Sequence, residues 1–151
     1  MKKKHLTSFA ALILFAICLP VTACSQSRIL ADFPSGAGVE KVVLNKTLVG
    51  MGMQNLYNSF DYGGNVSGSV EGIEVYNCGN TELAATVKAK IDELVKKYNA
   101  QVVIEAEEGD HTSIICNLYN EKEQKKPIGM AIIEYEGNEI NIVILHGAYF
   151  E

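Results

Sequence analysis

The stretch QVVIEAEEGDHTSIICNLY, residues 101–119, decides the fold because its apolar and polar side chains alternate. Residues 101–107 predict a strand, a glycine-containing turn is expected at 108–110, and residues 112–119 predict a returning strand. The first strand is expected to place three apolar side chains on one face of a sheet: Val102, Ile104 and Ala106. The stretch therefore predicts an antiparallel hairpin.

The sequence on either side extends this hairpin. Two more strands are predicted over 128–135 and 140–144, which makes a four-strand meander with short turns. Before the meander, residues 81–98 predict an amphipathic helix, with an apolar stripe formed by Leu83, Val87, Ile91, Leu94, Val95 and Tyr98. Such a one-sided stripe is expected to pack on the sheet.

The first half of the chain predicts one or two earlier strands, over 39–44 and 72–76, and a helix over 46–60. The glycine- and serine-rich residues 61–72 are expected to form a mobile loop or a weak hairpin. The predicted class is α+β, with a mostly antiparallel sheet and two helices packed on one of its faces.

Alternation leaves a second set of apolar side chains on the opposite face of the predicted sheet: Val103, Ile115, Ile133, Val143 and Leu145. If these side chains form one exposed patch, they are expected to bind a partner. If a second layer or an oligomer covers them, that expectation no longer holds.

Residues 1–23 have the layout of a secretory signal peptide. A lysine triplet precedes the apolar run FAALILFAICL at 9–19, which is shorter than the about 20 residues that a membrane-spanning helix needs. The sequence VTAC at 21–24 resembles the lipobox of bacterial lipoproteins. That resemblance implies cleavage before Cys24, and a lipidated Cys24 that carries fatty acyl chains such as palmitate. A plain signal peptide that is cut after Ala23 is the alternative.

These features divide the chain into a signal peptide at 1–23, a short tether at 24–28 and a single α+β domain at 29–151. Ser25 follows the lipidated residue where an Asp would oppose transport to the outer membrane. We therefore expect a protein of the bacterial cell envelope, anchored in the outer membrane and facing the periplasm. A location on the cell surface stays open.

Three sequence patterns follow in order: VEKVVLNKTL at 39–48, IEVYNC at 73–78 before the amphipathic helix, and the meander. Together with the exported amino terminus, they resemble a family of small exported bacterial proteins, the domain of unknown function number 4252. The resemblance covers most of 29–150. It implies no catalytic residues.

Composition limits the classes of partner. The chain is 48% apolar and 21% charged, with a formal charge of −5, and removal of three lysines with the signal makes the remaining body more acidic. Nucleic-acid binding needs a basic face, so no nucleic-acid partner is expected.

Two cysteines remain in the domain, Cys78 and Cys116. An oxidising compartment permits a disulfide, but spacing does not show that their Cα atoms come close enough for one. Two buried thiols are the preferred interpretation, and a bridge is left open.

No catalytic or metal site is predicted. His111 lies in an acidic stretch that a solvated hairpin tip explains, and His146 follows the inward register of the last strand. A nucleophilic pair of His146 with Cys78 or Cys116 is disfavoured, because a reactive thiolate needs an electropositive, accessible pocket and Cys116 lies on the apolar face of a strand. Three aromatic side chains near the glycine-rich segment are expected to close the core rather than bind a ligand: Tyr57, Phe60 and Tyr62.

Three functions are consistent with these observations. The first is a membrane-anchored, non-catalytic binding or interaction module for an envelope protein or small ligand, without a cofactor. The others are an envelope enzyme with an unrecognised site and a structural or stress-related envelope component.

Overall fold

The computed structural model describes residues 28–52, 66–120, 122 and 125–151, and the side chains of residues 51 and 52 are not described. Within these residues it forms a six-stranded antiparallel sheet in the order β1-β2-β6-β5-β4-β3. The elements along the chain are β1 (Val39–Asn45), α2 (Lys46–Gly52), β2 (Val66–Cys78), α4 (Ala84–Lys97), β3 (Gln101–Glu108), β4 (His111–Tyr119), β5 (Pro127–Glu136) and β6 (Glu139–Phe150). The prediction of an α+β fold with a mostly antiparallel sheet and two helices is confirmed.

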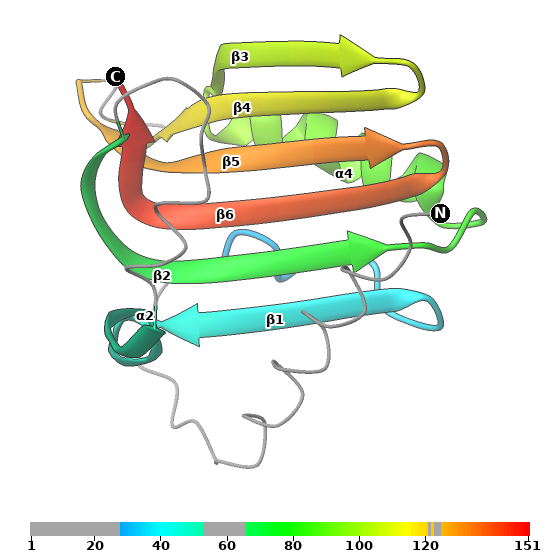
Figure 1. The fold of residues 1–151 in the computed structure, drawn as a ribbon, viewed down its shortest axis with the longest axis horizontal. Coiled ribbons are helices and arrows are strands. Elements are labelled where there is room, and N and C mark those ends of the chain that lie inside the picture. The colour runs from blue at the N-terminus through cyan, green and yellow to red at the C-terminus, as the bar shows by residue number, and fades with distance from the viewer. Residues whose placement is uncertain (1–27, 53–65, 121, 123–124) are drawn as a thin grey trace.

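One face of the sheet is covered by α4 and by the chain segment before β1 (Figure 1). The helix contributes Val87, Ile91 and Leu94 to this cluster, as its apolar stripe predicts. From the strands come alternate side chains: Tyr76, Cys78, Cys116, Leu118, Ala131, Ile133, Ile140, Ile142 and Ile144. We call this side the α4 face.

The second face carries an apolar cluster of its own, to which α2 contributes Val49. The two helices therefore cover opposite faces, and the expectation that they share one face is wrong. The reason is that β4, β5 and β6 carry apolar side chains at consecutive positions, so both faces of the sheet must be buried. We call this side the α2 face; its buried strand residues include Ile73, Ile115, Met130, Ile132 and Leu145.

Some of the apolar side chains that the sequence places on the second face lie on the other face of the sheet. Ile115 and Leu145 lie there and are 0% and 4% exposed, so they do not form the exposed patch that would indicate a partner surface. The expectation that Ile133 lies on this face is wrong, because it aligns with Ile142 on the α4 face. Val103 is 39% exposed.

The first strand of the meander also differs from its prediction. The β3–β4 register shifts between Val102 and Ile104, so Val102 opposes Cys116 of the α4 face while Ile104 packs on the α2 face. An extra residue in one strand reverses the side-chain direction beyond it. The expectation that Val102 and Ile104 share a face is therefore wrong.

β2 is longer than predicted and bends together with β6. Residues 66–72 belong to this strand, which pairs with β6, so the expectation of a mobile loop or a weak hairpin over 61–72 is wrong for them. Residues 61–65 lie outside the described part. The β2–β6 register shifts between Gly68 and Gly72. Gly68 and Gly147 both have positive φ, 85° and 81°, and a Cβ at Gly68 would lie 2.2 Å from the Gly147 carbonyl oxygen. Glycine permits this close approach.

A side chain fastens the bent end of β6 to β4. The Asn117 amide nitrogen donates to the Phe150 carbonyl oxygen at 2.7 Å, and the Phe150 N–H donates to the Asn117 Oδ1 at 2.8 Å. The buried amide thus takes the place of a strand backbone, which satisfies two groups at the end of the sheet.

Candidate functional site

The most unusual group on the α4 face is the carboxylate of Glu74. Alternation along β2 turns Glu74 to the same side as Tyr76 and Cys78, and the residue is only 3% exposed. A buried carboxylate is costly unless hydrogen bonds compensate for its lost hydration. Its partners therefore define the site.

Three donors surround this carboxylate. The backbone N–H of Ile29 donates to Oε1 at 2.7 Å, and that of Leu30 donates to Oε2 at 2.9 Å. The His146 Nε2 lies 2.7 Å from Oε1, and the two side chains are 17% and 4% exposed for His146 and Glu74. Because an ionised carboxylate only accepts hydrogen bonds, Nε2 carries the proton of this contact. We call Glu74, His146 and the two backbone N–H groups the Glu74 latch.

The balance of these contacts favours the ionised carboxylate. Burial is the largest influence and raises the pKa of Glu74. The hydrogen bond from His146, the two backbone hydrogen bonds and the attraction of the imidazole together outweigh it, so the pKa lies below its ordinary value. The latch therefore holds a negative charge inside the domain.

Strand register makes room for the imidazole. His146 aligns with Gly72 on β2 and with Gly129 on β5, so neither neighbour has a side chain beside the ring. The sequence correctly places His146 on the inward register, but it does not reveal its partner. The sequence does not point to Glu74, because its apolar neighbours Ile73 and Val75 lie on the opposite face of the predicted strand.

From the latch, the chain segment before β1 continues across the α4 face, over β2 and β1. Lys41 Nζ donates to the Phe33 carbonyl oxygen at 2.5 Å, and the Tyr76 hydroxyl donates to that of Pro34 at 3.1 Å. The Phe33 and Tyr76 rings meet edge to face with centroids 5.3 Å apart. Farther along, the Gly79 N–H donates to the Gly38 carbonyl oxygen at 2.9 Å. The latch is thus the first of a series of contacts over residues 29–38.

The two cysteines of the domain are free and buried. Cys78 lies on β2 and Cys116 on β4, with β6 and β5 between them, so three strand spacings separate them by about 14 Å or more. A disulfide needs Cα atoms within about 7 Å, so strand order rules out a bridge within this chain. Burial raises the pKa of Cys116 to about 11, although a hydrogen bond with the Ala131 backbone lowers it.

His146 is also separated from both cysteines. Cys116 on β4 aligns with Ala131 on β5, which aligns with Ile144 on β6. Cys116 therefore lies two strands from β6, and Ile144 is two residues from His146. Cys78 aligns with Ile140, six residues or about 20 Å from His146 along β6. Neither thiol reaches the imidazole.

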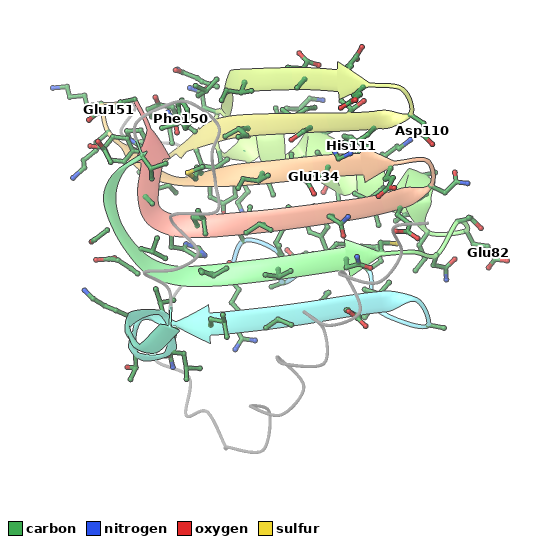
Figure 2. All side chains as sticks on the ribbon, viewed as in Figure 1. Glu82, Asp110, His111, Glu134, Phe150 and Glu151 are labelled. Carbon is green, nitrogen blue, oxygen red and sulfur yellow. The ribbon has the colours of Figure 1, made fainter. Side chains whose placement is uncertain are left out.

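The acidic hairpin tip holds no metal cluster. Figure 2 shows His111 close to the turn that joins β3 and β4, where Gly109 has a φ of 65°. Within the residues that the structure describes, no group of three His, Cys, Asp or Glu side chains is arranged to hold a metal ion.

Other predictions concern residues outside the described part of the chain: Cys24, residues 53–60 of the predicted helix, and the three aromatic residues Tyr57, Phe60 and Tyr62. None of the helices over 28–52, 66–120, 122 and 125–151 is both long and apolar enough to span a membrane.

Comparisons with known proteins give no match to a family model, a curated protein or a solved structure.

Proposed function

We propose that this chain is a lipid-anchored protein of the bacterial envelope that acts as a non-catalytic binding or interaction module. The observation that supports this proposal best is the Glu74 latch. It holds Ile29 and Leu30 on the paired strands β2 and β6, only five residues after Cys24, the residue at which the lipobox resemblance implies lipidation. In this proposal residues 1–23 are removed and 24–28 form the tether of the domain at 29–151.

Two acyl chains on Cys24 hold a protein stably at a bilayer, whereas one chain holds it only marginally. The residues 24–28 span at most about 17 Å when fully extended. Because the latch fixes the next residues to a buried carboxylate, the sheet stays within that reach of the lipid surface. The tether thereby raises the effective concentration of the domain for neighbours in the same membrane.

In this proposal the membrane is the outer membrane and the domain faces the periplasm. Its partner is an envelope protein or a small ligand. A resemblance to the domain of unknown function number 4252 fits an exported domain of this size, and it stays an expectation.

The Glu74–His146 pair favours a second candidate, an envelope enzyme. A carboxylate that orients an imidazole is the supporting half of many hydrolytic sites. The Glu74 side chain is 4% exposed and that of His146 is 17% exposed, and Glu74 also accepts two backbone hydrogen bonds. These bonds favour a structural role for the carboxylate over a proton-transfer role.

The anchor is tested on the native protein and on a Cys24→Ala variant, both expressed with residues 1–23. We expect the native protein to fractionate with membranes and to show an amino-terminal Cys24 with a diacylglyceryl mass. The variant should lose both properties. A native polypeptide with an unmodified Cys24 thiol would contradict the proposal.

The interaction role is tested by crosslinking in intact cells, followed by purification of the native and Cys24→Ala forms. A partner that crosslinks to the anchored form alone, and that binds the purified domain, would support the module. Hydrolase activity that disappears in a His146→Gln variant, with the fold retained, would instead establish the enzyme.

A further inference from the structure

Charge is distributed unevenly along the strands. The turns between β3 and β4 and between β5 and β6 lie at one end of the sheet, and the Gly137 N–H donates to the Asp110 carbonyl oxygen at 3.3 Å. Residues 101–119 and 127–151 contain no Lys or Arg. We call this the acidic end, defined by Glu107, Glu108, Asp110, Glu134, Glu136 and Glu139, of which all but the half-buried Glu134 are exposed.

The opposite end contains the β4–β5 connection and the end of α4. The Tyr119 N–H donates to the Tyr98 carbonyl oxygen at 2.7 Å, which holds the end of α4 to the end of β4. We call this the tether end, and its lysines are Lys46, Lys96, Lys97, Lys122, Lys125 and Lys126. In sequence, four glutamates belong to the same segments or lie beside them, at 71, 121, 123 and 151. The six lysines therefore outnumber the glutamates. Figure 2 shows Asp110 and Phe150 at opposite ends of the sheet.

The chain enters the domain from the tether end. As residue numbers fall from Gly38 to Ile29, the contacts move from Gly79, just after β2, through Tyr76 to Glu74 on that strand. Because β2 begins at the tether end, the segment 29–38 has its amino end directed there.

The latch also lies nearer the tether end. Gly129, the neighbour of His146 on β5, is two residues from the start of that strand and seven from its end. These intervals correspond to about 7 Å and about 23 Å. A tether with a reach of about 17 Å restricts the domain, whose β5 alone is about 30 Å long, to a narrow set of orientations.

From these observations we propose that the domain stands on an anionic lipid surface on its tether end, with the acidic end directed away from the membrane. The proposal rests on the lipid anchor at Cys24 and specifies the surface that meets the lipid. Anionic headgroups attract the lysines of the tether end and repel carboxylates. The effect fades over a Debye length of about 8 to 10 Å, so the acidic end escapes repulsion only in this orientation.

The test uses the natively lipidated full-length protein in vesicles of equal parts phosphatidylglycerol and phosphatidylcholine. Two matched single substitutions, Asn120→Cys and Asn138→Cys, place a fluorophore in an exposed turn at the tether end and the acidic end. Energy transfer to a headgroup-labelled lipid reports how close each turn lies to the surface. The protein without an added cysteine is the labelling control, because Cys78 and Cys116 are buried.

We expect transfer from position 120 to exceed transfer from position 138 by about twofold or more. A triple variant, Lys122→Gln with Lys125→Gln and Lys126→Gln, should reduce this difference, and so should vesicles of phosphatidylcholine alone. Equal transfer from the two positions, or greater transfer from position 138, would overturn the orientation.

The mass of the Cys24 peptide from the same samples separates this proposal from the proposed function. A lipidated Cys24 with equal transfer rejects the orientation and leaves the anchor intact. An unmodified Cys24 rejects the anchor, and the orientation that depends on it falls as well.

Discussion

At the scale of single residues, the main feature is that one carboxylate joins three distant parts of the chain. Glu74 on β2 bonds to the amino-terminal segment and to His146 on β6, across 44 or more residues of sequence in every case. Hydrogen bonds to a charged group contribute more than those between neutral groups. The latch is thus a strong local contribution to the stability of the domain.

Removal of this charge should destabilise the fold. A Glu74→Gln substitution keeps one acceptor but leaves a buried N–H group without its partner, which costs about 1 to 3 kcal/mol. Urea unfolding measures the loss, and Glu107→Gln on the exposed part of β3 is the matched control, with a change within about 0.5 kcal/mol. Equal stability of the two variants would contradict the role of the latch.

The latch also predicts an acid-sensitive stability. Because the folded-state pKa of Glu74 is lowered, its contribution is present above the ordinary value of 4.5 and is lost as the pH falls through the folded pKa. The urea midpoint of the native protein should therefore fall more steeply than that of Glu74→Gln between about pH 5 and pH 3. Parallel pH profiles for the two proteins would show that Glu74 does not titrate this way.

Because Cys78 and Cys116 are buried, we expect their thiols to react slowly with alkylating reagents in the folded protein. With a pKa of about 11, Cys116 holds little thiolate near neutral pH, and Cys78 is fully buried. Alkylation of both should be at least about 100-fold slower in the folded protein than in urea. Mass spectrometry of time points counts the adducts, and rapid native labelling would contradict the burial of these residues.

These residue roles were only partly predictable from sequence. The buried position of Cys116 follows from strand alternation, and so does the inward direction of His146. Glu74 was missed because a lone glutamate in a strand is usually exposed, and its backbone partners come from a segment without a recognisable pattern. Alternation gives the face of a side chain but not the distant group that it meets.

At the scale of elements, the bend shared by β2 and β6 distinguishes this sheet from a flat meander. Positive φ values at Gly68 and Gly147 allow the two strands to turn together, and Asn117 fastens the turned end to β4. Val70 and Ala148, which lie in the bent parts of β2 and β6, thereby pack in the apolar cluster of the α2 face.

A methyl group at this bend should be poorly tolerated. Gly147→Ala introduces a Cβ 2.5 Å from the Ser69 carbonyl oxygen at a φ of 81°, and we expect a loss of at least about 2 kcal/mol. Gly50→Ala in α2 is the control, because among the described residues no atom outside its own helix turn lies within 4 Å of the added Cβ, and alanine favours helix by up to about 1 kcal/mol. Thermal or urea unfolding compares the two, and similar effects would contradict the strained bend.

Elements with simple periodicity were predictable and the bend was not. The amphipathic helix was expected over 81–98 and spans Ala84–Lys97. Residues 66–72 have the composition of a loop, yet their glycines serve a bulged strand in which two backbones come close. Composition alone does not separate these two uses of glycine.

At the scale of the whole molecule, carboxylates concentrate where the strands of two hairpins turn. Glu136 and Glu139 are direct cross-strand partners, and His111 aligns with Glu136. Like charges that face each other across two strands destabilise the pair. The acidic end is therefore under electrostatic repulsion that the rest of the fold offsets.

Salt should relieve this repulsion. Raising the ionic strength from 0.01 M to 0.15 M shortens the Debye length from about 30 Å to about 8 Å, so the free energy of unfolding should rise. A Glu139→Lys variant should gain about 0.2 to 1 kcal/mol at low salt and depend less on salt. Urea unfolding at both salt concentrations tests this, and a stability that falls with salt would contradict it.

The path of residues 29–38 alongside β2 has a mechanical consequence. A force that pulls on the amino end of this segment acts along its length, so it shears the contacts at Glu74, Tyr76 and Lys41 together instead of peeling them one at a time. If Cys24 carries the proposed lipid anchor, tension from a moving bilayer is shared among several bonds, and the domain can follow the membrane without unfolding.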